Sequence, residues 1–445
     1  MKLWQKNQAS LAQVEKFTVG RDKEFDLQLA PFDVLGSIAH VIMLEKVGLL
    51  QKDEMEELVS ALRSIYQDID EGNFQLDESV EDIHSQVELI LTRKLGDTGK
   101  KIHSARSRND QVLVDIKLYL RHELESLVHT IAPFFELLQT KSEAHKDDLL
   151  PGYTHLQLAM PSSFGLWFGA YAESLVDDLI TLQSAYEVVN KNPLGSAAGY
   201  GSSFPINRSL TTRLLGFSDL NYNVVYAQMS RGKTERIVAQ ALANLADTLS
   251  KMSMDACIFL NQHFGFISFP AELTTGSSIM PHKKNPDVFE LIRSHCNRIK
   301  ALPNEIMMMT TNLPSGYHRD LQLLKEHLFP AFSTLRDCLQ MAGLMFQHME
   351  VKKDLLMDEK FKYLFSVEEV NKLVNQGMPF RDAYKKVGLD IENGHFTYDT
   401  HIQHTHEGSI GNLCNPEIRK QWDTVFNKFP FGEINRAEEL LVKNK

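Results

Sequence analysis

The chain has 445 residues, of which 43% are hydrophobic, and this length suggests roughly three domains with a large core. Lysine and arginine number 47 against 58 aspartate and glutamate residues, and the net charge of −11 implies no broad attraction to nucleic acid or to an anionic membrane. Four scattered cysteines lack metal-ligand spacing and are typical of reduced cytoplasmic thiols. Residues 1–17 lack the apolar centre of a signal peptide, and we expect no apolar run long enough to span a bilayer.

Helical periodicity is the dominant pattern of this chain. Apolar residues recur at three- and four-residue steps through residues 112–131, 168–186 and 238–252, and each series would form the core-facing stripe of a helix. Residues 234–264 contain neither proline nor glycine, so a very long helix is allowed there. Alternating strand patterns are scarce. We therefore predict an all-α protein whose centre is a bundle of long antiparallel helices.

Two small, mostly helical domains are expected to flank this central bundle. We place an N-terminal domain at residues 1–108, the bundle at residues 109–360 and a C-terminal helical domain at residues 361–445. The sequence shows no internal repeat, low-complexity tract or obvious flexible linker that would add a further unit.

Two polar segments have simple interpretations. Residues 195–201 are glycine-rich, but no strand is predicted before them, so they do not indicate a dinucleotide site. His401, His404 and His406 lie in a polar tail without a nearby cysteine, and a solvated surface explains them better than a metal site. We therefore expect no metal.

Residues 276–286 have the composition of a mobile loop that carries functional groups. Ser277 and Ser278 follow a flexible glycine, and prolines stiffen the far half of the segment, which also contains Lys283 and Lys284. Such a loop could deliver a hydroxyl and cations to a carboxylate-rich substrate, although it lacks the second glycine of a phosphate-binding Walker loop. From these residues alone, an ordinary basic surface loop is an equal alternative.

Four segments of the chain resemble signature regions of the fumarase/aspartase superfamily of lyases. In chain order they are residues 103–111, residues 151–157, residues 276–287 and a C-terminal motif at residues 377–381. The ending Lys-Lys-Asn-Pro-Asp at residues 283–287 is similar to that of the argininosuccinate lyase family in particular. The likeness runs from about residue 17 to about residue 388, which is most of the chain.

This resemblance implies a reaction and an assembly. Lyases of the superfamily remove a proton next to a carboxylate, expel a nitrogen or oxygen leaving group and release fumarate. The argininosuccinate lyase family splits argininosuccinate into L-arginine and fumarate, in arginine biosynthesis, with neither a metal nor an organic cofactor. The superfamily forms homotetramers. The alternatives are another superfamily lyase, such as adenylosuccinate lyase, aspartase or fumarase, and a crystallin-like structural protein on the same scaffold.

The resemblance also assigns acid–base roles. It implies that Ser277 is the general base, acting as an alkoxide that neighbouring positive charge and backbone N–H groups would stabilise. Lys283 would in addition stabilise the dianion-like intermediate, and Asn285 would position the loop or the substrate. His155, paired with Glu290, is a second acid/base candidate.

Further residues are implied to hold the substrate. Ser107, Arg108 and Asn109 would bind carboxylate oxygens, with bidentate geometry from the arginine, and Thr154 would be a second carboxylate donor. The residues expected to grip the arginine half of the substrate are Tyr317, Gln322 and Lys325.

The chain departs from the commoner family pattern at three places. His282 stands where glutamine is usual, and Leu323-Leu324 replaces an acidic pair. Gly20-Arg21-Asp22 occupies the region where the family often has a substrate-binding serine. The contacts to the arginine half are therefore expected to differ in detail.

Helix geometry predicts where the active site is assembled. Arg108 lies just before a helix expected to start near Asp110, and His155 lies just after that helical stretch ends near Leu149. About forty residues at 1.5 Å each would span roughly 60 Å, and one kink at Pro133 does not fold the rod back on itself. Because one small molecule needs both motifs, we predict active sites between the subunits of a homotetramer.

Overall fold

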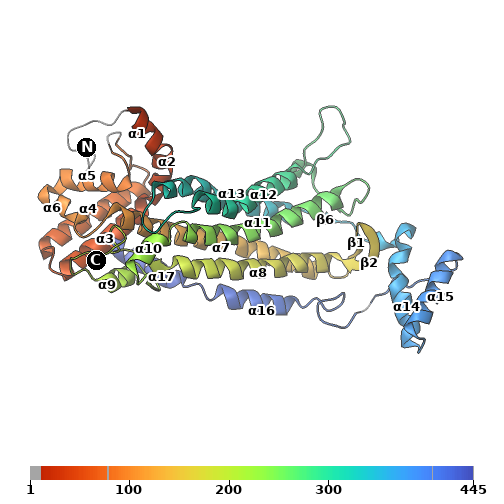
Figure 1. Cartoon of the computed structure of the whole chain (residues 1–445). Helices are drawn as coiled ribbons and strands as arrows, with labels where there is room; N and C mark the ends of the chain where they lie inside the picture. The colour runs from red at the N-terminus through yellow and green to blue at the C-terminus, as the bar shows by residue number, and fades with distance from the viewer. Residues whose placement is uncertain (1–11, 78–79, 403, 444–445) are drawn as a thin grey trace.

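The computed structural model describes residues 12–77, 80–402 and 404–443 of the chain. In this part of the chain, long helices form an elongated bundle with the N-terminal helices at one end (Figure 1). The paired helices α14 (Ser366–Asn375) and α15 (Phe380–Glu392) lie at the other end. The prediction of an all-α protein with a central bundle of long antiparallel helices is confirmed.

The N-terminal segment forms a group of helices against the start of the bundle. These elements are α1 (Ala12–Val19), α2 (Asp22–Asp26), the 3-10 helix η1 (Leu27–Leu29), α3 (Ala30–Lys46), α4 (Lys52–Asp70), α5 (Ile83–Leu95), α6 (Asp97–Lys100) and the 3-10 helix η2 (Lys101–His103). Helix α4 is amphipathic. It buries Leu58, Leu62 and Ile65, spaced by four and three residues, and it packs on α3.

Helix α3 is the buried centre of this group. The stretch Asp22–Lys46 is long and apolar enough to cross a membrane by length and composition, which corrects the expectation that no such run exists. However, 78% of its most apolar window is buried inside the protein. Its apolar character therefore belongs to the core of the N-terminal helices.

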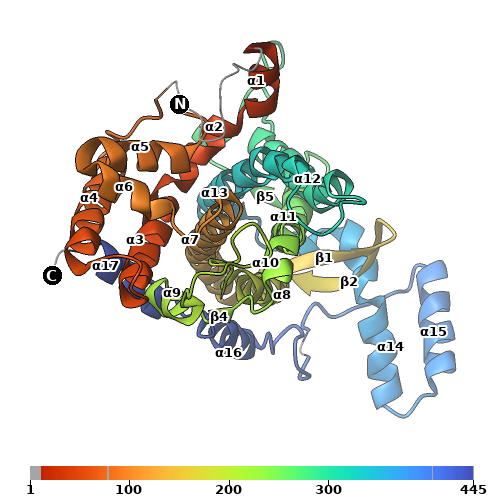
Figure 2. The same cartoon turned by 60° about the vertical axis from the view of Figure 1, so that its left-hand side comes forward.

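The central bundle contains the longest helices of the described chain. They are α7 (Arg108–Ala144), α8 (Phe164–Val189), α11 (Lys233–Leu260), α12 (Asp287–Met309) and α13 (Leu324–Gln347). The stripes expected from the sequence face the core, since Leu120, Leu124 and Leu127 of α7 and Leu242 and Leu245 of α11 are fully buried. Figure 2 shows these helices side by side around the core that they share.

Short strands and turns connect the long helices. The antiparallel hairpin of β1 (Leu149–Thr154) and β2 (Gln157–Ser163) lies at the end of the bundle away from the N-terminal helices (Figure 1). The other strand pairs are β3 (Lys191–Asn192) with β4 (Asp219–Leu220), and β5 (Ile267–Ser268) with β6 (Glu350–Val351). The remaining connecting helices are α9 (Arg208–Leu214), α10 (Val224–Met229), η3 (Ala271–Leu273), η4 (Arg319–Leu323), η5 (Leu355–Met357) and η6 (Glu359–Phe365).

The chain after residue 360 contributes to two separate cores. Helices α14 and α15 enclose a small core of their own around Val370, Ala383 and Val387. The last two helices return along the bundle instead, and α16 packs on α8 while α17 packs on α3 and α9 (Figure 1). Their bounds are Asn415–Phe426 for α16 and Phe431–Val442 for α17.

Helix α17 also supplies a charge to the bundle. The side chain of Arg121 on α7 is 1% exposed, and its guanidinium forms an ion pair with Glu438 of α17. The same guanidinium donates to the carbonyl of Leu215 at 2.8 Å. Helix α17 therefore compensates a charge that α7 buries inside the protein.

Candidate active site

A pocket lies where the N-terminal helices meet the start of α7. Its volume is about 170 Å³. Five residues that the sequence analysis assigned to substrate binding line it, namely Arg108, Asn109, Tyr317, Gln322 and Lys325. The structure thus gathers, within one chain, residues from the start of α7 and from the segment around η4 and α13.

A capping box fixes the start of α7 beside this pocket. The carboxylate of Asp110 accepts a hydrogen bond from the backbone N–H of Ser107 at 2.9 Å, and Ser107 Oγ accepts one from the N–H of Asn109 at 3.3 Å. Asp110 Oδ2 also accepts the backbone N–H groups of Gly195 and Ala197, at 3.0 and 2.9 Å. The glycine-rich segment therefore holds the first turn of α7 in position.

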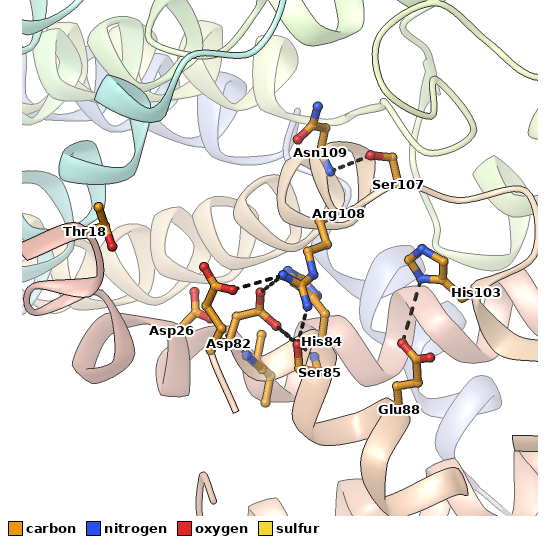
Figure 3. Close-up of polar contacts among 12 residues, drawn as sticks. Thr18, Asp26, Asp82, His84, Ser85, Glu88, His103, Ser107, Arg108 and Asn109 are labelled. Atoms are coloured by element: carbon orange, nitrogen blue, oxygen red, sulfur yellow. Dashed lines mark hydrogen bonds and ion pairs between the residues drawn. The ribbon is translucent and has the colours of Figure 1, made fainter. Parts of the chain in front are cut away.

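Arg108 points toward an acidic wall built by the N-terminal helices. Its guanidinium lies 3.2 Å from Asp82 and 3.5 Å from Glu81, and it donates to Ser85 Oγ at 2.5 Å (Figure 3). Asp82 in turn caps α5 by accepting the backbone N–H of Ser85 at 2.8 Å. The start of α5 therefore orients the arginine that is expected to bind a substrate carboxylate.

Gln322 and Lys325 hold the N-terminal segment on the other side of the pocket. Gln322 Nε2 donates to the carbonyl of Thr18 at 3.0 Å. Lys325 Nζ lies 2.6 Å from Asp26 Oδ1 and 2.8 Å from Asp22 Oδ1. The side chains expected to grip the arginine half of a substrate are thus in contact with the chain's own first helices.

The carboxylates that line this pocket were not predicted from the sequence. They are Asp22, Asp26, Glu81 and Asp82. They come from two segments that no local spacing relates, so only the folded chain reveals that they share a wall. The acidic pair directly before α5 is the one sequence signal that could have pointed to them, because acidic residues mark helix N-termini.

A buried charged cluster adjoins the pocket through His84, which is one of the lining residues. His84 Nδ1 lies 2.7 Å from Asp33 and 3.6 Å from Asp115, and all three side chains are nearly inaccessible. Burial by itself would lower the pKa of His84, but the charge and hydrogen bond of Asp33, together with Asp115 and Asp82, raise that pKa to about 10. The three groups are close enough to ligate a metal ion. The hydrogen bond and the raised pKa favour a charged imidazolium that ties α3, α5 and α7 together.

Thr154 and His155 lie at the opposite end of the bundle, at the tip of the hairpin. His155 (φ 53°) and Leu156 (φ 60°) are both left-handed, and Thr154 pairs with Gln157, which is the geometry of a type I′ turn. Neither central residue is glycine, so the turn is strained, and strain of this kind concentrates at functional sites. Leu156 is 83% exposed. The tip therefore presents Thr154 and His155 away from the body of its own chain.

The loop before α12 carries Ser277, Lys283 and Asn285. Ser277 Oγ accepts hydrogen bonds from the backbone N–H groups of Ile279 and Met280, at 3.3 and 3.1 Å. Lys283 Nζ donates to Asn285 Oδ1 at 2.5 Å, and the Asn285 amide donates to a backbone carbonyl at the start of the loop at 3.2 Å. Two N–H donors on one hydroxyl oxygen would stabilise negative charge there, as a serine base requires.

A single chain does not bring together the pocket at Arg108, the hairpin tip at His155 and the loop that carries Ser277. Helix α7 has 37 residues, about 55 Å of helix, between Arg108 and the hairpin that carries His155. The loop before α12 lies at the hairpin's end of the bundle (Figure 1). Glu290 is exposed in the first turn of α12, and among the described residues it makes no hydrogen bond or ion pair with His155. The pairing of His155 with Glu290 stays a prediction.

The chain is similar to known lyases over its whole length. Residues 5–301 match the family described as lyase. The argininosuccinate lyase of Bacteroides fragilis is 60% identical over 444 residues, which cover 100% of this chain and 99% of that protein. The argininosuccinate lyase of Thermotoga neapolitana is 38% identical over 386 residues, which cover 87% of this chain and 97% of that protein.

Solved structures share the fold. An EDDS lyase in complex with formate superposes with a TM-score of 0.77 at 20% identity, covering 98% of this chain and 95% of its own. A class II fumarase from Schistosoma mansoni superposes with a TM-score of 0.71 at 15% identity, covering 99% of this chain and 96% of that chain. At these identities the superpositions show the fold, and the closer sequence relatives show the family. The chain is a carbon–nitrogen lyase and belongs to the argininosuccinate lyase family of the fumarase/aspartase superfamily.

Proposed function

We propose that the protein cleaves argininosuccinate into L-arginine and fumarate in arginine biosynthesis, without a metal or organic cofactor. The observation that carries this proposal is the pocket in which Arg108 and Lys325 face Asp22 and Asp82. Argininosuccinate combines several carboxylates with an ammonium and a guanidinium group. It therefore needs cationic and anionic partners within one pocket.

Ser277 acts as the general base in this proposal. It takes the proton from the succinyl carbon beside a carboxylate, and the electron pair of the C–H bond passes into that carboxylate to give a dianion-like intermediate. The pair then forms the double bond of fumarate while the bond to the guanidinium nitrogen breaks, and that nitrogen gains a proton. The N–H groups of Ile279 and Met280 support the alkoxide form of the base.

Cations and hydrogen-bond donors stabilise the intermediate. Lys283 places its ammonium near the developing second negative charge, and Asn285 positions the loop or the substrate. Ser107, Arg108 and Asn109 hold carboxylate oxygens at the start of α7. Thr154 is a second carboxylate donor, contributed from the hairpin tip. Tyr317, Gln322 and Lys325 hold the arginine half.

His155 handles the second proton transfer, with Glu290 as its partner. A carboxylate next to an imidazole favours the protonated ring and orients it, which suits a group that exchanges protons near neutral pH. Because both residues lie about one helix length from Arg108, this pair reaches the substrate only from another subunit.

The protein acts in the cytoplasm as a homotetramer with active sites between subunits. The length of α7 supports this assembly, since the hairpin tip of one chain can meet the Arg108 end of an antiparallel neighbour. The exposed, strained tip at His155 supports it too, because strain of that kind is retained where a function needs it.

A substrate panel tests the reaction. The purified protein is mixed in turn with argininosuccinate, adenylosuccinate, aspartate and malate, and fumarate is followed by its ultraviolet absorbance. We expect fumarate from argininosuccinate at a rate far above that from the others. Preferred release from adenylosuccinate, aspartate or malate would reassign the substrate. No release from any of them would favour a crystallin-like structural protein. Analytical ultracentrifugation of the same sample checks the tetramer.

A further inference from the structure

Lys325 lies between two carboxylates at one wall of the pocket. Its Nζ is 2.6 Å from Asp26 Oδ1 and 2.8 Å from Asp22 Oδ1. The side chains of Lys325 and Asp26 are 4% and 3% exposed, whereas that of Asp22 is 20% exposed. Two anions and one cation leave this cluster with one surplus negative charge when both carboxylates are ionised.

The two carboxylates differ in how much of their bonding capacity is already used. Asp26 Oδ1 bonds Lys325, and Asp26 Oδ2 accepts the backbone N–H of Ile83 at 3.0 Å, so both oxygens of Asp26 serve the fold. Asp22 bonds Lys325 through one oxygen, and its side chain has no other hydrogen bond within the described ranges. Asp22 is therefore the carboxylate of this cluster that can still accept a ligand donor.

The unused hydrogen-bonding groups of Lys325 and Asp22 indicate what kind of ligand the cluster can bind. An ammonium carries three N–H donors, and two of those on Lys325 point to the aspartates, so one is left for a ligand carboxylate. The free capacity of Asp22 suits a ligand cation next to that carboxylate. A carboxylate and an ammonium on the same carbon, as in an α-amino acid, match both groups at once.

Electrostatics points the same way. Burial raises the pKa of Asp22, while Lys325 lowers it and the charge of Asp26 raises it further. Within the described ranges, Lys325 is the one cation that bonds the ionised form of Asp22, and Asp26 uses the same ammonium, while Arg231 adds a weaker favourable charge. A ligand cation placed beside Asp22 would compensate the surplus charge of this cluster and make binding selective for ligands that bring one.

We infer that Asp22 is a specificity-determining residue which requires a free, protonated α-amino group on the arginine half of the substrate. The inference rests on the proposed function and adds to it a residue at which this chain departs from the serine expected in that region. A neutral hydroxyl would discriminate weakly between an ammonium and an amide. The partly buried carboxylate of Asp22 rejects an Nα-acyl group, because the amide brings no charge and leaves the second carboxylate oxygen without a partner.

Equilibrium binding tests the inference without any turnover. Isothermal titration compares L-arginine with Nα-acetyl-L-arginine on the full-length wild-type protein and on Asp22→Ser and Asp22→Asn. We expect the wild type to favour L-arginine by at least about 100-fold, and both variants to narrow that ratio to under about tenfold. A wild-type ratio near one overturns the inference, and so does a ratio that either folded variant leaves unchanged. Thermal melting identifies a variant that has not folded. The binding ratio of the other Asp22 variant is then compared with that of the wild type.

The matched control lies on the same short helix. Glu24 of α2 is exposed, and it pairs with Arg21 at 2.9 Å rather than with the pocket. Glu24→Gln removes a carboxylate two residues from Asp22, and we expect it to leave the binding ratio at its wild-type value. An equal narrowing in Glu24→Gln would show that the general charge of α2, and not Asp22, causes the selectivity.

Fumarate release separates this inference from the proposed function. The wild type is mixed with argininosuccinate and with its Nα-acetyl derivative. If argininosuccinate yields no fumarate, the proposed function fails, and the binding ratios still decide the role of Asp22. If argininosuccinate yields fumarate and its Nα-acetyl derivative does so equally well, the inference fails alone.

Discussion

Ser277 Oγ lies 3.1 Å from the backbone nitrogen of Met280 and accepts its hydrogen bond. Ile279 donates to the same oxygen at 3.3 Å. These contacts make Ser277, and not its neighbour Ser278, the hydroxyl of the loop that is prepared to carry negative charge.

Replacing Ser277 with alanine should remove the general base and leave the fold intact. We expect the turnover number for argininosuccinate to fall by about 10²–10⁴-fold. Substrate binding should be nearly unchanged, because the hydroxyl removes a proton and does not contribute a binding contact. Fumarate release measures turnover, and thermal melting measures folding. Ser278→Ala is the control and should retain far more activity. Near-normal turnover in folded Ser277→Ala would refute the assignment.

Replacing Lys283 with methionine keeps the length of the side chain and removes its charge. The loss of one preorganised charge contact should cost about 3–4 kcal/mol at the transition state, a reduction of several hundred-fold or more in rate. Steady-state kinetics should show that kcat falls more than KM rises. If KM alone rose, Lys283 would bind ground state and transition state equally and would not stabilise the intermediate. Lys284→Met is the matched control in the same loop.

Mixing two inactive variants should restore activity if the site lies between subunits. Arg108→Ala damages one end of α7, and His155→Ala damages the hairpin at the other end, about 55 Å away. Some sites in mixed tetramers then receive both intact motifs, so partial activity should return after joint dissociation and reassembly. Mass spectrometry of intact tetramers confirms the mixing. Persistent inactivity in mixed tetramers, or a fully active monomer, would contradict the assembly.

Asp178 should make the protein less stable as the pH rises toward neutrality. Burial raises the pKa of this carboxyl, its hydrogen bond from Thr248 at 2.7 Å lowers it, and Asp177 and Asp247 raise it again, to about 7. Because the folded state holds this proton more tightly than the unfolded state, the associated stability is present at acidic pH and is lost between about pH 4 and pH 7.

Asp178→Asn should remove the loss of folding stability between about pH 4 and pH 7. The amide oxygen still accepts from Thr248, so the variant should gain a few kcal/mol over the wild type at pH 8 and much less at pH 4.5. Chemical denaturation at both pH values measures the difference. Asp177→Asn, at the exposed neighbouring position, should shift stability only slightly. An equal gain at both pH values would mean that packing rather than ionisation explains the effect.

The long helices were predictable because their signal is local and repeated. The series from residue 112 to residue 131 already defines the buried face of α7, and the absence of proline and glycine after residue 234 allows α11. The hairpin was not predicted, since Pro151, Gly152 and Pro161 interrupt the alternation that marks a strand. The domain boundaries stay a prediction.

The candidate site was predictable only for residues that lie within a local sequence motif. The resemblance marked Arg108 and Lys325, and the fold places both in one pocket. The acidic partners Asp26 and Asp82 reach that pocket from separate helices, and no single-sequence pattern encodes such a meeting. His84 was missed for the same reason, since its raised pKa depends on carboxylates from α3 and α7.

The ion pair between Arg121 and Glu438 has a consequence for biosynthesis. The two residues are 317 positions apart, and the guanidinium of Arg121 is otherwise held by neutral oxygen acceptors. On a ribosome that adds roughly 5–20 residues per second, the nascent bundle would wait roughly 15–60 s for this counter-charge. The native state therefore cannot be completed before α17 emerges. A message cut short before the codon for Glu438 would yield chains with an uncompensated buried arginine, which protein quality control can recognise.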